Sequence, residues 1–481
     1  MTRSFAEKAV DLAARTERNS AWRQRDCFNL IPSEATPSLL VKMCEIADPA
    51  GRYAEHRTMK GAEVYFYQGT DFIRDVEVEC QREMAEYFGC TDIELRPVSG
   101  QMANEVVFKG LVKFLNRGRA EGQLSRRVRE VLNNELIYGG HLSAQPMGAL
   151  FNYVDEDPAT GKELVVNFPV RKDNPYKPDL DRLAAILDSH KPELVIFGKS
   201  MFLYREPVKF VADIVRGWKD RPVLMFDMAH VLGLYGAFQA PFEEGADLVT
   251  GSTHKTFFGT QRGVVAGNIP KDSPLRPLWA EIKGRAFPGS TSNHHLGTLL
   301  GLLMASYEMN AFKAPFQNQV RANARALAKA LSAHGIPVEG DPSDGYTETH
   351  QVIIRVKPFG RGMDIARRLE ENNVLTNYQA LPDDATFLES SGIRLGVQEM
   401  TRFGMVEKDF DTLAGLMSDI VIRNKPAGPE VARYRKNFLT MGFTLPPAEA
   451  LPLAARVLAS AIPDPAYAAR FADNLRQAAG A

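Results

Sequence analysis

Short apolar runs alternate with amphipathic stretches through the middle of the chain, from about residue 90 to residue 290. Four of these runs have the length of a β-strand and are rich in Val, Ile and Leu: ELVIFG (193–198), PVLMFD (222–227), DLVTG (247–251) and GVVAGN (263–268). Runs without polar alternation are typical of strands buried on both faces, as in a parallel sheet covered by helices. The pattern therefore predicts an α/β fold for this region.

Three stretches repeat their apolar positions at helical spacing. Residues 5–25 have a charged amphipathic pattern, and residues 99–115 predict a helix that begins near Ser99. Because a helix brings positions three or four residues apart onto one side, residues 316–333 would share an apolar face of Val320, Ala324, Leu327 and Leu331. We expect these helices to pack against the sheet or against a smaller neighbouring region.

The C-terminal third of the chain has a different pattern. HQVIIRV (350–356) and GIRLGV (392–397) predict strands of a smaller α+β region, and residues 426–481, rich in Ala and Pro, predict helices. We therefore expect four segments: an N-terminal helical arm (1–50), a large cofactor-binding α/β domain (51–310), a small C-terminal α+β domain (311–425) and a helical C-terminal extension (426–481).

Composition narrows the class of protein. The 481 residues are 44% hydrophobic and 24% charged, which is ordinary for a globular protein. The formal net charge of −1 argues against a nucleic-acid or membrane partner. The sequence has neither the apolar core of a signal peptide at its start nor an apolar stretch long enough to span a bilayer. Its four cysteines lack paired metal-ligand spacing, so we expect reduced thiols and a cytoplasmic location.

Charged residues follow the ends of two predicted strands. Asp227 ends PVLMFD, and Lys255 follows DLVTG after the polar residues Ser252, Thr253 and His254. In an open α/β sheet, ligands gather at the carboxyl ends of the strands. A lysine amine can form a Schiff base with pyridoxal 5′-phosphate, and a carboxylate can keep its pyridinium nitrogen protonated. This pair makes pyridoxal phosphate the candidate cofactor.

Three other stretches could complete such a site. SGQMAN (99–104) begins a predicted helix, whose N-terminal N–H groups could bind a phosphate. His141 follows two glycines in YGGHLS and could stack on the cofactor ring. Arg394 lies in a predicted strand and could bind the carboxylate of an amino acid through both guanidinium nitrogens.

Each of these residues also has an ordinary structural interpretation when taken alone. These alternatives are a strand-end cap for Asp227, a solvated loop for Lys255, turn packing for His141, an ion pair for Arg394, and helix-start positions for Ser99 and Asn104. The adjacent His294 and His295 have no spaced carboxylate, so they are weak evidence for a metal site and we expect none.

The order of the motifs resembles the serine hydroxymethyltransferase family, which has the aspartate-aminotransferase fold type of pyridoxal-phosphate enzymes. The similarity runs from about residue 25 to residue 425 and rests on LIPSEATPS (30–38), RYAEH (52–56), SGQMAN, GGHL, FDMAHVLGL, DLVTGSTHKT, SGIRLG and MTRFG, in family order. It implies a mostly parallel sheet of the seven-stranded type, flanked by helices, with a smaller C-terminal α+β domain.

The resemblance also implies roles on the cofactor side. Lys255 matches the Schiff-base lysine, Asp227 the partner of the pyridine nitrogen, and His141 the ring-stacking histidine. The other matching positions are His230 at the cofactor's phenolic oxygen, His254 beside the lysine, and the cofactor contact Ser200. We also expect Ser99, Gly100, Gln101 and Ser252 to bind the cofactor, with Gln101 standing where the family has a serine.

On the substrate side, the resemblance implies a set drawn from two copies of the chain. Ser33 matches a substrate-side residue, and Arg394 matches the arginine that binds the substrate carboxylate. Tyr53, Glu55 and Tyr67 would serve the site of a neighbouring subunit, with Glu55 as the acid–base carboxylate. We therefore expect a homodimer or a dimer of dimers. The predicted catalytic residues are Lys255, Glu55, Tyr53, His141 and His254.

The resemblance implies an enzyme that makes or breaks the Cα–Cβ bond of a β-hydroxy-α-amino acid through a glycine quinonoid, with an aldehyde as the second small-molecule partner. Some positions depart from the family: Gln101 replaces a serine, Gln261 an arginine and Gln379 an asparagine. THQV (349–352) and GVQEMTR (396–402) are more similar to the L-threonine transaldolases.

These departures leave alternatives open. One is an L-threonine transaldolase or aldolase that depends little on folate. Another is an oxygen-dependent oxidase or decarboxylase on the same scaffold. Tetrahydrofolate is accordingly left open as a second cofactor.

Overall fold

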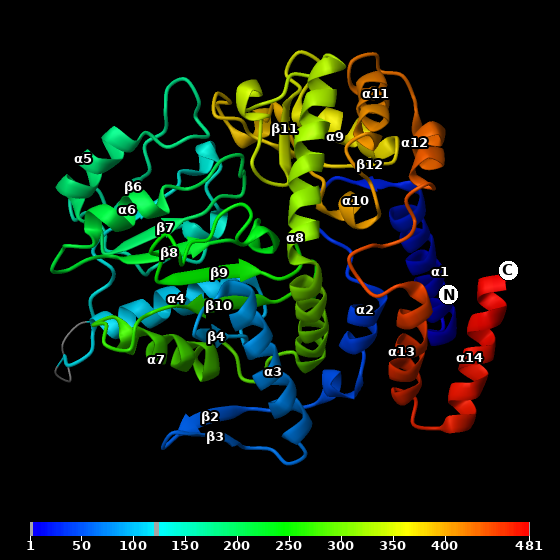
Figure 1. The fold of residues 1–481 in the computed structure, drawn as a ribbon, viewed down its shortest axis with the longest axis horizontal. Helices are drawn as coiled ribbons and strands as arrows, with labels where there is room; N and C mark the ends of the chain where they lie inside the picture. Colours follow the sequence, from blue (N-terminus) through cyan, green and yellow to red (C-terminus); the bar gives the residue numbers. More distant parts are fainter. Residues whose placement is uncertain (1–2, 120–124, 481) are drawn as a thin grey trace.

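A seven-stranded sheet lies at the centre of the larger half of the molecule (Figure 1). The structure is a computed structural model that describes residues 3–119 and 125–480, so the outermost positions of the predicted arm and extension lie outside it. In spatial order the strands are β4 (Asp92–Glu94), β10 (Gly263–Gly267), β9 (Leu248–Ser252), β8 (Val223–Asp227), β7 (Leu194–Phe197), β5 (Val131–Asn133) and β6 (Val165–Asn167).

The sheet is mostly parallel, which confirms the predicted α/β class. One strand differs from the sequence-based expectation: β10, predicted from GVVAGN as one more buried parallel strand, is antiparallel to both β9 and β4. The turn from residue 253 to residue 262 explains the difference. A parallel return needs a crossover of a dozen or more residues, usually with a helix, and this connection is too short for one.

Both faces of the sheet are covered by helices, and successive strand residues face opposite layers. Phe197, Phe226 and Val249 belong to a core shared with α3 (Asp71–Phe88), α5 (Leu180–His190), α6 (Val208–Val215) and α8 (Leu296–Ala333). The preceding residues Ile196, Met225 and Leu248 belong to a second core under α4 (Gly100–Leu115) and α7 (Arg276–Gly284). This double burial is why the strands lack polar alternation.

The long helix α8 connects the large sheet to a smaller one (Figure 1). The predicted apolar face Val320, Ala324, Leu327 and Leu331 is buried in its C-terminal half. The smaller sheet is antiparallel, in the order β11 (Gln351–Arg355), β14 (Gly392–Gly396) and β13 (Asn377–Gln379). Around it lie α9 (Gly362–Glu371), α10 (Gln398–Arg402) and α11 (Asp409–Val421). The predicted domain boundary near residue 310 falls within α8, and the division into domains stays a prediction.

The N-terminal arm and the C-terminal helices lie beside the smaller sheet. The arm consists of α1 (Phe5–Ala21), which continues in a π-helical turn, β1 (Phe28–Asn29) and α2 (Leu39–Glu45). Strand β1 pairs in parallel with β12 (Val374–Leu375). The C-terminal helices are α12 (Gly428–Arg435), α13 (Pro447–Ser460) and α14 (Pro465–Gly480).

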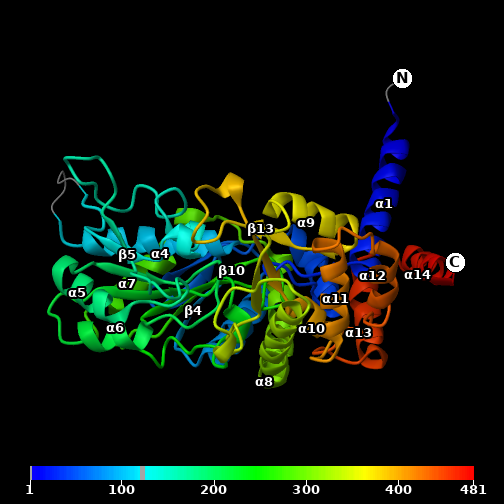
Figure 2. The same cartoon turned by 90° about the horizontal axis from the view of Figure 1, so that it is seen from above.

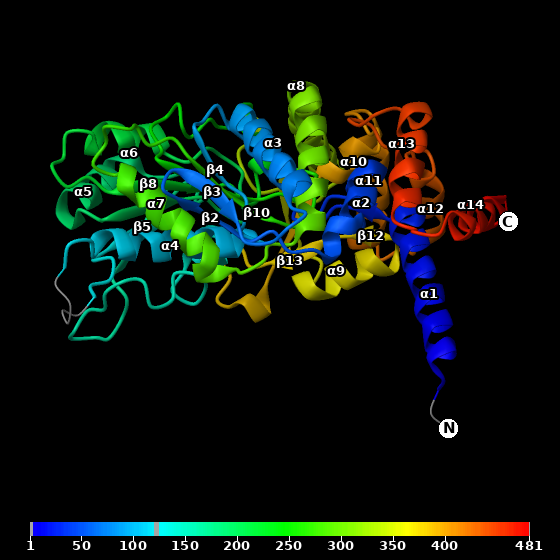
Figure 3. The ribbon, with the colours of Figure 1, turned by 90° about the horizontal axis from the view of Figure 1, so that it is seen from below.

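Two further features complete the outline of the molecule. Helices α1 and α14 project from the end farthest from the large sheet (Figures 2 and 3). A two-stranded hairpin, β2 (His56–Met59) and β3 (Ala62–Tyr65), extends from the larger half beside α3 (Figure 1). Within the described ranges, no helix combines the length and hydropathy that a membrane-spanning segment needs.

Candidate active site

Adjacent parallel strands bring Asp227 and Lys255 to the same edge of the large sheet. Asp227 is the last residue of β8, and Lys255 lies in the turn after β9. The amine Nζ of Lys255 is 3.2 Å from Nε2 of His230. Burial lowers the pKa of Lys255 to about 8, against an upward effect of the Asp227 charge and with a further lowering by Arg394. About a tenth of this amine is therefore unprotonated at pH 7, far more than for an ordinary lysine.

The Asp227 carboxylate is buried but well supplied with hydrogen-bond donors. Its Oδ2 accepts hydrogen bonds from Asn104 Nδ2 (2.7 Å) and from His141 Nδ1, and its Oδ1 accepts one from the backbone N–H of Ala229 (3.0 Å). Burial alone would raise its pKa, but His141, Asn104 and the Ala229 amide outweigh burial and hold the pKa below its usual value. The end of β8 thus carries a permanent negative charge.

His141 reaches Asp227 because its loop runs close to the sheet. A Cβ on the preceding Gly140 would lie 2.1 Å from the carbonyl oxygen of Asn134, so only glycine fits there. The His141 ring is nearly perpendicular to that of His230, with the ring centroids 5.3 Å apart. His141 thus contacts both the Asp227 carboxylate and the His230 ring, and His230 lies beside the Lys255 amine.

The N-terminus of α4 lies against the end of β9. Ser99 is the N-cap, and its Oγ accepts a hydrogen bond from the Met102 amide (3.1 Å). A Cβ on Gly100 would lie 2.2 Å from Oγ of Ser252, so a larger residue there would displace the Ser252 hydroxyl. The remaining N–H groups of the first turn form the kind of end that binds phosphate. The Gln101 side chain points to solvent.

Arg394 is buried on β14 without an acidic partner. Its Nη1 donates to the carbonyl oxygen of Ser200 (2.5 Å) and its Nε to Oδ1 of Asn377 (3.3 Å). Among the described residues, no carboxylate lies within ion-pair distance of it, and burial lowers its pKa to about 10. A buried cation of this kind favours an anionic ligand. The Ser200 hydroxyl donates to the carbonyl oxygens of Gly139 and Gly140 (3.3 Å each).

Three buried imidazole nitrogens in this region have no hydrogen-bond partner: Nδ1 of His230, of His254 and of His350. Burial, together with the charge of Lys255, lowers the pKa of all three rings, to about 4 for His254 and about 3 for His350. Buried polar atoms are almost always hydrogen-bonded in native proteins. Neutral imidazoles with free nitrogens, two cations and a helix N-terminus fit a polar, anionic cofactor such as pyridoxal phosphate.

Two residues next to strands of the smaller sheet, His350 before β11 and Gln398 at the start of α10, hold the turn that contains Ser33. His350 Nε2 donates to the carbonyl oxygen of Pro32 (3.0 Å), and Gln398 Nε2 donates to those of Ile31 (2.9 Å) and Glu34 (2.7 Å). Sequence reasoning noted the segments THQV and GVQEMTR but assigned no role to His350 or Gln398. The structure places both beneath the predicted substrate-side turn.

Tyr53, Glu55 and Tyr67 lie apart from this group. Tyr53 and Tyr67 are 52% and 42% exposed, and their ring centroids are 5.3 Å apart. Across residues 3–119 and 125–480, no hydrogen bond or ion pair connects the three residues to Lys255, Asp227 or Arg394. One copy of the chain therefore does not bring together the complete predicted set.

Arg262 and His294 form hydrogen bonds and close contacts within the protein, which indicates a structural role for both. The fully buried Arg262 guanidinium donates to the carbonyl oxygens of Leu95 (2.5 Å) and His295 (2.8 Å) and to Nδ1 of His294 (2.9 Å). On its other side, His294 Nε2 is 3.8 Å from the Glu77 carboxylate. In the part of the chain that the structure describes, no cluster of three or more His, Cys, Asp or Glu side chains is placed to hold a metal.

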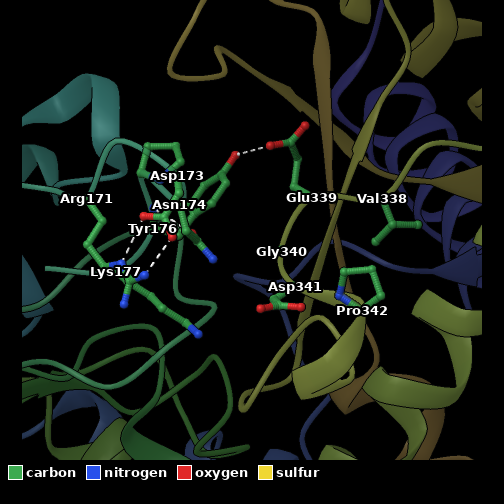
Figure 4. A pocket seen from close by; sticks show the side chains of 11 residues that line it. Arg171, Asp173, Asn174, Tyr176, Lys177, Val338, Glu339, Gly340, Asp341 and Pro342 are labelled. Carbon is green, nitrogen blue, oxygen red and sulfur yellow. Dashed lines mark hydrogen bonds and ion pairs between the residues drawn. The ribbon is translucent and has the colours of Figure 1, made fainter.

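Two cavities lie near or between the sheets. One of about 400 Å³ opens beside His254 and is also lined by Ser33 and Gln261. The other, of about 350 Å³, separates the loop 171–177 from the loop 338–342, and no predicted site residue lines it (Figure 4). There the Tyr176 hydroxyl donates to Glu339 (3.0 Å), which joins the two halves of the molecule. Only the first cavity adjoins the Lys255 region.

Comparison with known proteins shows which family this sequence matches. The sequence model described as serine hydroxymethyltransferase matches residues 6–417. Three curated relatives carry the same name. The one from Pyrobaculum arsenaticum is 36% identical, over 88% of this chain and 91% of its own. The one from Staphylothermus marinus is 36% identical over 89% and 91%, and the one from Aeropyrum pernix 35% over 91% and 93%.

A solved structure has a similar fold. The crystal structure of L-threonine transaldolase from Pseudomonas fluorescens, in its internal aldimine state, superposes with a TM-score of 0.76. The match covers 93% of this chain and 97% of that one, at 24% sequence identity. At this identity the likeness shows a shared fold and no more.

Proposed function

Because the chain belongs to the serine hydroxymethyltransferase family, we propose that it makes or breaks the Cα–Cβ bond of a β-hydroxy-α-amino acid with pyridoxal phosphate. The observation that supports this reaction most is the meeting of three groups where the large and small sheets approach each other. They are the anionic Asp227 and the Lys255 amine of lowered pKa, from the large sheet, and the buried Arg394 without an acidic partner, from the smaller one. Together they suit a cationic ring nitrogen, an aldehyde carbon and an amino-acid carboxylate.

The residues that would hold the cofactor come from several elements. The first turn of α4, with Ser99 and Gly100, suits the phosphate, and Asp227 suits the ring nitrogen. His141 lies where it can cover one ring face, and Lys255 is the covalent anchor. When bound, pyridoxal phosphate supplies the electron sink that makes a carbanion at Cα accessible.

The chain's own residues orient the substrate and supply hydrogen-bonding groups beside the Lys255 amine. Arg394 holds the substrate carboxylate through its planar guanidinium, which fixes the bond to be broken relative to the site. Burial holds the pKa of His230 well below its usual value, so this ring is neutral and can accept a hydrogen bond from the Lys255 amine 3.2 Å away. The buried His254 and His350 are likewise neutral and can accept hydrogen bonds.

The carboxylate that exchanges a proton with the substrate's β-hydroxyl would come from a second copy of the chain. Glu55 lies in a stretch of the chain, in and around the hairpin, that exposes several large apolar side chains: Tyr53, Met59, Val64, Phe66, Tyr67 and Phe72. Exposed apolar side chains that gather in one region commonly mark interaction sites. We propose a homodimer in which this hairpin reaches the Lys255 site of the other subunit.

Mixing two inactive variants should restore activity if the site is shared. Lys255→Ala and Glu55→Gln each inactivate every site in a homodimer, but a heterodimer has one site with both native residues. Random pairing makes half of the dimers mixed, so co-expression should recover about a quarter of native activity. The matched control is Lys255→Ala with Asp227→Ala, which lie in one site and cannot complement. No recovery in the first mixture would rule out sharing of Glu55.

We further propose an acceptor aldehyde other than formaldehyde and little dependence on folate. The supporting observation is that His350 and Gln398, from the two segments most similar to the L-threonine transaldolases, position the Ser33 turn. Gln261 also lines the cavity beside His254, where the family has an arginine. These differences affect what surrounds the substrate, while the Lys255, Asp227 and Arg394 group is complete.

A substrate screen distinguishes the reactions. We expect threonine to be cleaved without tetrahydrofolate, and a second aldehyde to be incorporated into a new β-hydroxy-α-amino acid, detected by mass spectrometry. Gln379→Asn, which introduces the family's residue, should leave threonine cleavage unchanged. Serine cleavage that is fast only with tetrahydrofolate would instead establish one-carbon transfer. Substrate-dependent oxygen consumption would favour the oxidase alternative.

A further inference from the structure

Asn104 is fully buried in the second turn of α4, and its side chain forms three hydrogen bonds that engage both amide hydrogens and the amide oxygen. One Nδ2 hydrogen is donated to Asp227 Oδ2 (2.7 Å) and the other to the Ser143 hydroxyl. Its Oδ1 accepts a hydrogen bond from the Thr250 hydroxyl (2.5 Å). This is more than a helix-start residue needs, because the side chain contacts three separate segments and caps nothing.

The Asp227 carboxylate determines which way the Asn104 amide faces, and Thr250 supports that orientation. The parallel register of β8 and β9 pairs Thr250 with Asp227, so both side chains lie on the same side of the sheet. Because an ionised carboxylate only accepts hydrogen bonds, the amide NH₂ must face Asp227, and the Thr250 hydroxyl then donates to Oδ1. The reverse orientation would place Oδ1 against the carboxylate, an acceptor against an anion.

We propose that Asn104, whose amide oxygen is held by Thr250, is a positioning residue that holds the Asp227 carboxylate in the one orientation that serves the cofactor's ring nitrogen. This inference rests on the proposed function. With Asn104 and His141 both donating to Oδ2 and the Ala229 amide to Oδ1, the free acceptor position that remains belongs to Oδ1. Such a network in a buried, low-dielectric site both fixes the group and stabilises its charge.

Four substitutions separate this role from simple packing. Asn104→Leu removes the donor and keeps the number and branching of the side-chain heavy atoms. Asn104→Asp replaces the donor by a carboxyl group beside Asp227. Thr250→Val removes only the hydroxyl that donates to the Asn104 amide oxygen, and Thr250→Ser retains it. Ser143→Ala is the matched control, because Ser143 bonds the same amide but does not contact Asp227.

The readout is the dissociation constant of pyridoxal phosphate, titrated into the apoprotein without substrate and followed by absorbance and protein fluorescence. Asn104→Leu loses a hydrogen bond to a charged group, so its dissociation constant for pyridoxal phosphate should rise about 10-fold at every pH. Thr250→Val should weaken it less, about 3-fold. Thr250→Ser and the control Ser143→Ala should bind like the native protein.

Asn104→Asp should show a pH dependence that a packing defect cannot produce. Two adjacent carboxyl groups cannot both ionise readily, so the pKa of one is raised. Below that pKa the introduced carboxyl is protonated and donates to Asp227 in place of the amide. Above it, two anions repel each other, so binding relative to the native protein should weaken at least about 10-fold between about pH 6 and pH 8.

Two results would overturn the proposal: Asn104→Leu binding that matches the native protein, or Asn104→Asp binding that keeps a constant ratio to native across this pH range. An equal loss in Asn104→Leu and the Ser143→Ala control would also overturn it, since both would then reflect packing. Because no substrate is present, a different reaction would leave these results intact. A native protein that binds no pyridoxal phosphate would instead refute the proposed function.

Discussion

Lys255→Ala should lower kcat by at least about 10²-fold, the lower end of what a positioned acid–base group contributes, and remove the covalent anchor. Noncovalent binding of pyridoxal phosphate should survive, because the α4 N-terminus, Asp227 and His141 are untouched. In the native protein, borohydride reduction and peptide mapping should place the label on Lys255. Lys271→Ala, an exposed loop lysine, is the control and should label normally.

The same anchor predicts a pH dependence for cofactor capture. Only the unprotonated amine attacks the aldehyde, and burial lowers the pKa of Lys255 to about 8. The second-order rate of capture by apoprotein, followed by stopped-flow absorbance, should therefore rise with pH and level off above about pH 8. A rise that continues to the usual lysine range, or a label on another lysine, would contradict the assignment of Lys255.

Arg394→Ala should raise the KM for the amino-acid substrate by about 10- to 100-fold, the value of a charge-assisted pair in a buried site. Arg394→Lys should not restore it. A single ammonium cannot both donate to the Ser200 carbonyl oxygen and bind a carboxylate through two nitrogens. Steady-state kinetics that separate KM from kcat provide the measurement.

Arg355→Ala is the matched control for this arginine. Arg355 lies on the paired strand β11, but its guanidinium already binds Glu339 and Asp383, so the KM should not change. An unchanged KM in Arg394→Ala would show that the carboxylate binds elsewhere. The proposed arrangement of the substrate would then be wrong, although the cofactor assignment would stand.

The local sequence pattern was sufficient to predict the strands and to single out the two charged residues that follow them. Because β7, β8 and β9 are buried on both faces, their sequences are continuously apolar, and Asp227 and Lys255 stand out after them. The family motifs likewise predicted the fold class, which the structure and the comparisons confirm. The roles of the individual site residues stay predictions.

The length of α8 and the direction of β10 required the tertiary structure. Only residues 316–333 had a clear one-sided apolar pattern, yet the helix begins at Leu296. Its first half lacks such a pattern because it is buried on several sides. Strand β10 has the apolar run of its parallel neighbours. The spacing of apolar residues indicates which strand positions are buried, but it does not indicate the direction of the strand. Here the direction depends on the short turn of residues 253–262.

The sequence by itself determined where apolar faces, strand ends and chemically active side chains lie along the chain, because these follow from local periodicity and residue type. Only the tertiary structure decided which distant residues meet. Asn104 reaches Ser143, Asp227 and Thr250, which are 39, 123 and 146 positions away, and no local pattern marks those contacts. Ser33 depends in the same way on His350 and Gln398. Such contacts are set by sheet register and helix packing, which depend on the whole fold at once.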